Sequence, residues 1–181
     1  MLNGLVSELR RLPPLSRTHD EMACLLAQAG TATRALPPLP HLPGAYTRAC
    51  AYADDRFEVL LLDWSQGAIS EIHDHGGQHC WFVVLDGQLH VEDYRRLDAG
   101  LTAECATIEA CGSLTLGPGD LDVRRGRFDI HRVGAIQGNA LSLHVYARPL
   151  HEFSIYDLKA QRCESVRARY DLAIPLIGGA A

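Results

Sequence analysis

The chain has 181 residues, of which 47% are hydrophobic and 22% are charged, and its formal net charge is −5 at pH 7. This length suits one domain with a substantial core, and the mild acidity argues against a nucleic-acid or anionic-membrane partner. The sequence contains no run of about 18 apolar residues, which a membrane helix would need, and no secretion signal at its start. We therefore expect a cytoplasmic monomer. Its six scattered cysteines form no C-x-x-C pair, which favours free thiols.

Two helices are predicted before the first strand. The first spans residues 2–11, and the second spans residues 19–29 after Ser16 or Thr18, with Glu21 at capping-box distance from Thr18. Residues 36–44 hold four of the nine prolines and should form a linker. Both helices are expected to pack on the outside of a later sheet. The apolar residues that define the first helix are Leu2, Leu5, Val6 and Leu9.

From Tyr46 onward the sequence consists of short apolar runs separated by turn residues. About ten such runs indicate a closed all-β barrel or sandwich. The tail after Pro175 is expected to fray. The predicted strands cover residues 46–52, 57–64, 81–85, 88–94, 101–108, 112–116, 121–123, 129–133, 141–146 and 153–156.

Two histidines separated by one residue, His73 and His75, suggest a metal site. In an extended segment their side chains point to the same face, whereas a helix would place them about 200° apart. Two imidazoles hold a divalent ion poorly, so a third ligand is needed. His131 is the best candidate, and His79 and His144 are alternatives. Three neutral imidazoles with open positions suit iron(II), copper or zinc, and the spacing leaves that choice open. The competing interpretation is a pair of solvated or hydrogen-bonded histidines.

The spacing around these histidines resembles the first cupin motif. Gly67 precedes His73-x-His75 by five residues, Cys80 follows after four, and Gly87 follows after six more. Gly119-Asp120 through His131 resembles a divergent second motif. Cys80 stands where ordinary cupins place a ligating Glu, and this substitution is similar to the cysteine dioxygenase family.

Two further segments are similar to the same family, in the expected order along the chain. Tyr46-Thr47-Arg48 resembles the segment that carries its substrate-carboxylate arginine. Ser142-Leu143-His144-Val145-Tyr146 resembles its Ser-x-His-x-Tyr run. The resemblance covers roughly residues 44–150. The loop Ala147-Arg148-Pro149 departs from the Ser-Pro-Pro of animal members and brings an extra cation near the expected mouth of the site.

The resemblance implies an Fe(II)-dependent cysteine dioxygenase that converts L-cysteine and O2 to cysteine sulfinate. It implies three iron ligands, a carboxylate clamp formed by Arg48 with Tyr46 beside it, and a thioether crosslink between Cys80 and Tyr146. It also implies that Ser142 orients His144, which hydrogen-bonds the Tyr146 hydroxyl. The implied iron ligands are His73, His75 and His131, and the implied catalytic group is Tyr146, His144, Ser142 and Cys80.

The implied fold is mainly β, a small jelly-roll-like cupin barrel with N-terminal helices packed outside. We expect a single domain over residues 1–181, with a helical region and linker at 1–43, the barrel core at 44–150 and a C-terminal extension at 151–181. The nearest alternative is the same chemistry on another small thiol such as 3-mercaptopropionate. A non-catalytic metal-binding cupin and a zinc hydrolase or isomerase on the same barrel are the others.

Overall fold

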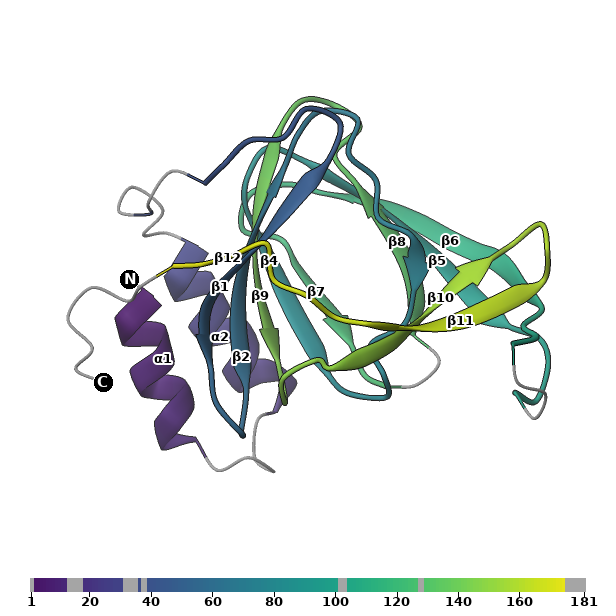
Figure 1. The fold of residues 1–181 in the computed structure, drawn as a ribbon. Helices are drawn as coiled ribbons and strands as arrows, with labels where there is room; N and C mark the ends of the chain where they lie inside the picture. The colour runs from purple at the N-terminus through teal and green to yellow at the C-terminus, as the bar shows by residue number, and fades with distance from the viewer. Residues whose placement is uncertain are drawn as a thin grey trace.

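The structure, a computed structural model, describes residues 2–12, 18–30, 36, 39–100, 104–126 and 129–174. In this part of the chain two helices precede a set of β-strands (Figure 1). The elements are α1 (Leu2–Arg11), α2 (His19–Gly30), β1 (Tyr46–Ala53), β2 (Glu58–Trp64), β3 (Ile72–His73), β4 (Cys80–Asp86), β5 (Leu89–Arg96), β6 (Ile108–Leu116), β7 (Leu121–Arg124), β8 (Ile130–Gly134), β9 (Ala140–Tyr146), β10 (Glu152–Asp157), β11 (Arg162–Arg167) and β12 (Leu172–Ala173).

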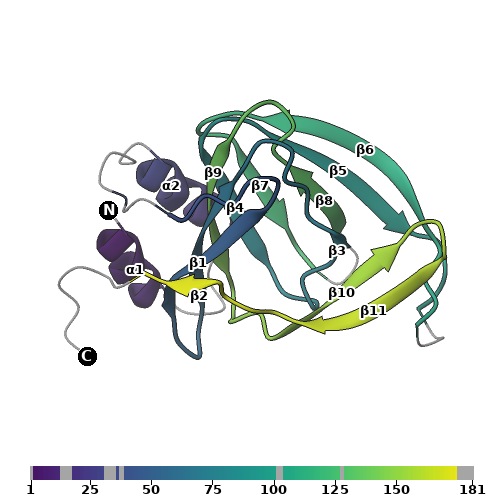
Figure 2. The same cartoon turned by 45° about the horizontal axis from the view of Figure 1, so that its top comes forward.

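The strands form two six-stranded sheets that face each other around a common interior (Figures 1 and 2). The first sheet has the order β12-β1-β2-β9-β4-β7, and the second has the order β11-β10-β3-β8-β5-β6. Most neighbours in the sheets are far apart in sequence, as in a jelly roll. The predicted fold class, a mainly β cupin barrel with helices outside, is confirmed.

Both helices cover the outer face of the first sheet, and their bounds agree with the prediction (Figure 2). The predicted capping box is present, because the Thr18 backbone N–H donates to Glu21 Oε2 at 3.0 Å and the Glu21 N–H donates to Thr18 Oγ1 at 3.3 Å. Neither helix is long and apolar enough to cross a membrane. The helical residues buried against the sheet are Leu2, Leu5, Val6, Leu9, Met22, Leu26 and Ala29.

Strand β2 shows why the sequences of the central strands are continuous apolar runs. Val59 and Leu61 point outward to the helices, while Leu60, Leu62 and Trp64 point into the barrel. Because a strand alternates its faces, burial on both sides removes the polar positions that a half-exposed strand would show. The interior of the barrel is therefore lined from the first sheet by every second residue of β2.

The prediction of two strands at 101–108 and 112–116 was wrong in the part that the structure describes. A single strand, β6, runs from Ile108 to Leu116 and pairs with β5. The register changes from Asp93 opposite Gly112 to Tyr94 opposite Ala110, so a bulge accommodates the interruption that suggested two strands. Residues 101–103 and the tail after Pro175 lie outside the described residues.

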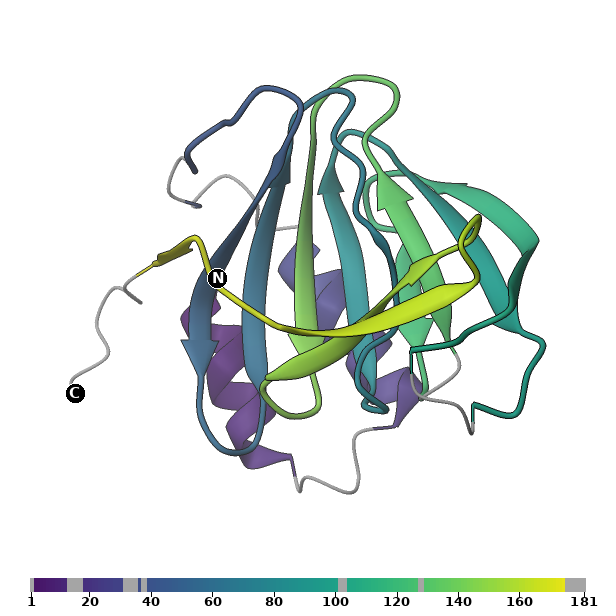
Figure 3. The same cartoon turned by 45° about the vertical axis from the view of Figure 1, so that its right-hand side comes forward.

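The C-terminal region contributes more to the fold than the sequence indicated. Strands β10 and β11 extend the second sheet beyond residue 150, and β12 pairs in parallel with β1 of the first sheet. The segment between β11 and β12 therefore crosses from one sheet to the other, as Figure 3 shows in yellow. The backbone N–H of Asp171 on this segment donates to the Arg48 carbonyl at 2.9 Å.

Candidate metal centre

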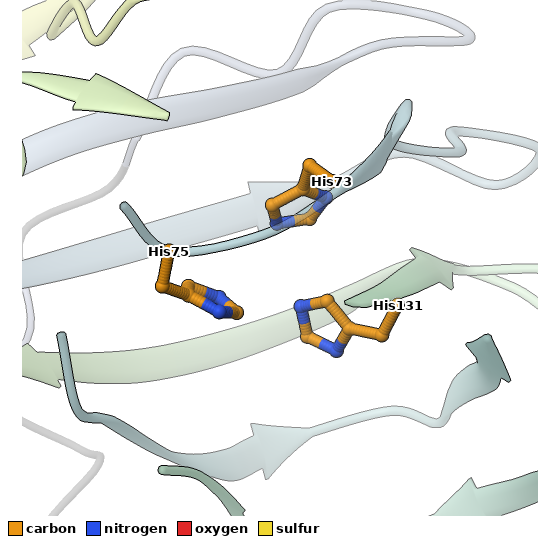
Figure 4. A group of neighbouring side chains, drawn as sticks. All are labelled: His73, His75 and His131. Carbon is orange, nitrogen blue, oxygen red and sulfur yellow. The ribbon is translucent and has the colours of Figure 1, made fainter. Parts of the chain in front are cut away.

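Three histidine side chains converge inside the barrel (Figure 4). His73 ends β3 and lies directly opposite His131 of β8, and His75 follows two residues after His73. The ring centroids are 4.7 Å apart for His73 and His131, 5.2 Å for His73 and His75, and 4.9 Å for His75 and His131. One nitrogen from each ring lies within 4.8 Å of the others. The alternation expected for an extended segment thus brings the first two histidines onto one face.

Burial keeps all three imidazoles neutral. It lowers the pKa of His73 to about 4 and holds the pKa of His75 and His131 well below the usual value. The Nδ1–H of His73 donates to the Glu71 carbonyl at 2.8 Å, which leaves its Nε2 as the ligand atom. The neutral imidazole is the form that binds metals.

The donor set also fits a divalent cation because one nitrogen of each ring lies close to a nitrogen of the other two. Among the described residues, no hydrogen bond joins the three rings, and converging neutral imidazoles without such a bond are an arrangement that a metal ion would complete. Nδ1 of His75 and Nδ1 of His131 are also buried with no hydrogen bond in the described residues.

The first sheet supplies most of the other polar side chains of the site, and Ser70 and Glu71, just before β3, also line the cavity. Arg48 and Tyr46 lie on β1, and both line the cavity that holds the three histidines. Nη2 of Arg48 is buried without a hydrogen-bond partner. Its backbone is fixed to the crossing segment, because the Arg48 N–H donates to Asp171 Oδ2 at 2.7 Å. A buried guanidinium with an open donor is suited to binding an anion.

A hydrogen-bonded chain leads from Trp64 through Ser142 to His144. The Trp64 Nε1–H donates to Ser142 Oγ at 2.9 Å, and Ser142 Oγ lies 2.8 Å from His144 Nε2. Burial and, next, the charge of Arg48 lower the pKa of His144 to about 3, so its ring is neutral. The Ser142 hydroxyl can therefore donate to Nε2, which leaves the proton of His144 on Nδ1.

The expected contact between Ser142 and His144 is thus present, but the expected bond from His144 to Tyr146 is not. These two rings stack with centroids 6.4 Å apart, and the described residues show no hydrogen bond between them. Tyr146 instead lies directly opposite Cys80 in the register of β4 and β9. Burial raises the pKa of both groups, so thiol and phenol are both neutral.

The cavity around the three histidines has a volume of about 220 Å³ and is closed mainly by apolar side chains. Cys80 does not line it and lies behind Tyr146. Several lining residues come from the C-terminal extension, for which the sequence suggested no role. Apolar and aromatic side chains lining the cavity are Leu62, Trp64, Val133, Leu150, Phe153, Ile155 and Val166.

The alternative third ligands lie away from the triad. His79 packs against Trp81, with ring centroids 5.6 Å apart, and His144 is engaged with Ser142. Arg148, expected near the mouth of the site, lines a separate surface groove together with His79. Its charge is therefore outside the cavity that contains Arg48.

Comparisons with known proteins match this arrangement to one family. The family described as cysteine dioxygenase type I matches residues 43–159, more than half of the chain. The chain belongs to the cysteine dioxygenase type I family. Among curated relatives, cysteine dioxygenase type 1 of Danio rerio is 26% identical over 121 residues, which cover 64% of this chain and 57% of the relative. The enzyme of Rattus norvegicus is 27% identical over 115 residues, covering 62% and 56%.

The chain spans little more than half the length of these curated relatives. Among solved structures, KdgF from Halomonas sp. is similar with a TM-score of 0.48 at 15% identity, covering 62% of this chain and 87% of that one. A double-stranded β-helix protein from Klebsiella pneumoniae gives 0.49 at 15% identity, covering 69% and 93%.

Proposed function

We propose that this chain is a thiol dioxygenase that uses Fe(II) and O2 to oxidise L-cysteine to cysteine sulfinate. Both oxygen atoms of O2 end on sulfur, so sulfur is oxidised by four electrons and O2 is reduced by four. One observation carries the proposal. The open guanidinium of Arg48 and three neutral histidines line the same enclosed cavity, which suits a ligand with a carboxylate at one end and a metal-binding thiol at the other.

In this proposal His73, His75 and His131 hold the metal through neutral imidazoles and leave positions open for the substrate. A bound ferrous ion would supply a coordination site for the thiol and would relay electrons from the sulfur to O2. The absence of a carboxylate ligand keeps the positive charge of the site available to the thiolate. The apolar lining excludes water from the reacting sulfur.

Arg48 binds and orients the substrate. Its planar guanidinium can form two parallel hydrogen bonds to a carboxylate, which fixes the direction of the bound molecule. Anchoring of its backbone by Asp171 holds the donor in place. Tyr146, a neutral phenol in the same cavity, is the candidate hydrogen-bond donor to the reacting end, and the chain of Trp64, Ser142 and His144 supports the wall beside it.

The test is anaerobic loading with Fe(II), followed by exposure to ¹⁸O2 and thiol, with oxygen uptake and product mass measured together. L-cysteine should gain two ¹⁸O atoms. 3-Mercaptopropionate, which lacks the amine, and cysteamine, which lacks the carboxylate, should have lower kcat/KM. A higher kcat/KM for 3-mercaptopropionate would reassign the substrate, and no oxygen uptake with any of the thiols would remove the proposal.

Arg48→Ala should raise KM for L-cysteine by roughly 10–100-fold, because a charge-assisted hydrogen bond contributes about 1.5–3 kcal/mol. Its metal content and its KM for cysteamine should stay close to those of the unchanged protein. Arg148→Ala is the matched control, since this cation lies in the separate groove. An equal effect of the two substitutions would show that net charge, and not a clamp, determines the KM.

A further inference from the structure

A cluster of charged side chains lies inside the barrel next to the triad, where the sequence suggested only strands. Asp122 and Arg124 lie on β7, and Asp93 lies on β5 of the opposite sheet. Their side chains are 12%, 8% and 30% exposed. Charged groups are rarely buried to this extent unless they are paired, so the burial of these three side chains must be explained by the groups that they contact.

Arg124 joins the two acids. Its Nη1 donates to Asp93 Oδ1 at 2.5 Å, its Nε donates to Asp122 Oδ2 at 3.1 Å, and its Nη2 also contacts Asp122 Oδ2. The guanidinium therefore bridges the two sheets and fixes the Asp122 carboxylate. Both Arg124 contacts fall on Oδ2, and the Val123 N–H donates to Oδ1 at 2.7 Å, so of the carboxylate's about four lone-pair sites one on Oδ1 remains open.

The Asp122 carboxylate lies beside a metal-site histidine. Its Oδ2 lies 3.9 Å from Nδ1 of His131. That nitrogen is buried and has no hydrogen-bond partner in the described part of the chain, and the His131 side chain is 3% exposed. In Figure 4 the edge of the His131 ring that lies farthest from its backbone points toward the other two rings. Nδ1 is therefore the nitrogen left for a partner outside the metal site.

We propose that Asp122, held in place by Arg124, is the positioning residue of His131. With a metal at the other ring nitrogen, the Nδ1–H would donate to the Asp122 carboxylate, whose nearer oxygen lies 3.9 Å away, so a shift of about 1 Å would bring the pair to hydrogen-bond distance. The bond fixes the tautomer and orientation of the ring and makes it a stronger donor. The site thereby gains the effect of a carboxylate without giving up a coordination position. This inference rests on the metal site of the proposed function.

The test compares zinc affinity of the metal-stripped full chain, measured by competition with a chromophoric chelator. Asp122→Ala should weaken zinc binding by about 10–100-fold, and Asp122→Asn, which keeps an acceptor but not the charge, should fall between it and the unchanged chain. Asp93→Ala is the matched control, because it also removes one partner of Arg124; Asp93 lies opposite His131 in the register of β5 and β8, but among the described residues the carboxylate contact of His131 is with Asp122. Asp93→Ala should leave the affinity unchanged. Equal losses for Asp93→Ala and Asp122→Ala, or no loss for either, would overturn the proposal.

A second measurement needs no substitution and stands if Asp122→Ala fails to fold. In the zinc-loaded chain, histidine ¹H–¹⁵N spectra should show a proton on Nδ1 of His131 that is shifted downfield and exchanges slowly with solvent. His75 is the internal comparison, since its Nδ1 is also buried without a hydrogen-bond partner, and in the described part of the chain it pairs with no acidic side chain. Similar signals for the two histidines would overturn the proposal. Zinc affinity does not require thiol oxidation, so an inactive chain would refute the proposed reaction and leave this inference intact.

Discussion

Cys80 and Tyr146 lie opposite each other on the neighbouring strands β4 and β9. This register places the sulfur beside the aromatic ring, where oxidation could join them by a carbon–sulfur bond. The bond removes one hydrogen from the thiol and one from the ring, with O2 as the oxidant. We expect the Fe(II)-loaded chain to lose two hydrogens from its intact mass during turnover.

Cys50→Ser is the control for this crosslink, since Cys50 is a partly buried thiol on β1. It should lose two hydrogens as the unchanged chain does, whereas Cys80→Ser and Tyr146→Phe should not. A mass loss that persists in Cys80→Ser would place the modification elsewhere in the chain.

For individual residues, the sequence predicted those features of the site that depend on residues close together in the chain. The two-residue spacing of His73 and His75 predicted their common face, and the structure bears this out. His131 was the best candidate for the third ligand, with His79 and His144 as alternatives, and the structure brings it to the other two histidines. Asp122 and Arg124 were missed because the burial of a charged side chain depends on partners from another strand, here Asp93. A single sequence contains no direct signal for that pairing.

At the scale of elements, the two glycines that flank the histidine segment differ in the space available for a side chain. Gly67 has φ of +83° and no heavy atom within 4 Å of the position of an added Cβ. Gly87 has φ of +71°, and an added Cβ would lie 2.1 Å from the Asn139 carbonyl oxygen and 2.8 Å from Ala140 Cα. Both positions favour glycine by backbone conformation, but only Gly87 is also blocked by neighbouring backbone.

Gly67→Ala should therefore cost about 1–2 kcal/mol of unfolding free energy, the penalty for a left-handed residue with a side chain. Gly87→Ala should cost clearly more, because the turn between β8 and β9 must move to admit the methyl group. Urea unfolding of the two variants measures the difference. Equal losses would mean that backbone conformation alone explains both glycines.

The elements that sequence reasoning missed share a physical cause. Strand β11 is an edge strand whose residues are mostly exposed, so it lacks the alternation of apolar residues that identified β2 or β9. Its pairing with β10 defines it as a strand. Helices α1 and α2 were predicted well because an apolar stripe and a capping box are local signals. The pairing of one strand with another, in contrast, leaves no signal in the local sequence.

For the molecule as a whole, the candidate site joins the two sheets. The histidines that would hold the metal come from β3, β8 and the residues after β3, while Arg48, His144 and Tyr146 come from β1 and β9. The cavity therefore exists only when the sheets face each other correctly, and the crossing segment before β12 fastens Arg48 to the C-terminal region. Folding and site assembly are coupled for this reason.

This coupling predicts that metal binding stabilises the entire fold. A ligand that binds only the native state at 100 times its Kd adds about 2.7 kcal/mol, which corresponds to roughly 5–11 °C in Tm for a domain of this size. Anaerobic Fe(II) should raise Tm by such an amount in the unchanged chain. His131→Ala should abolish the shift, because two imidazoles hold a divalent ion poorly. His79→Ala should retain it, since that ring packs on Trp81 outside the triad. The three histidines are the one group of three potential ligands in the described residues. A Tm shift that vanishes in His79→Ala and survives in His131→Ala would therefore show that the metal binds elsewhere than at this group.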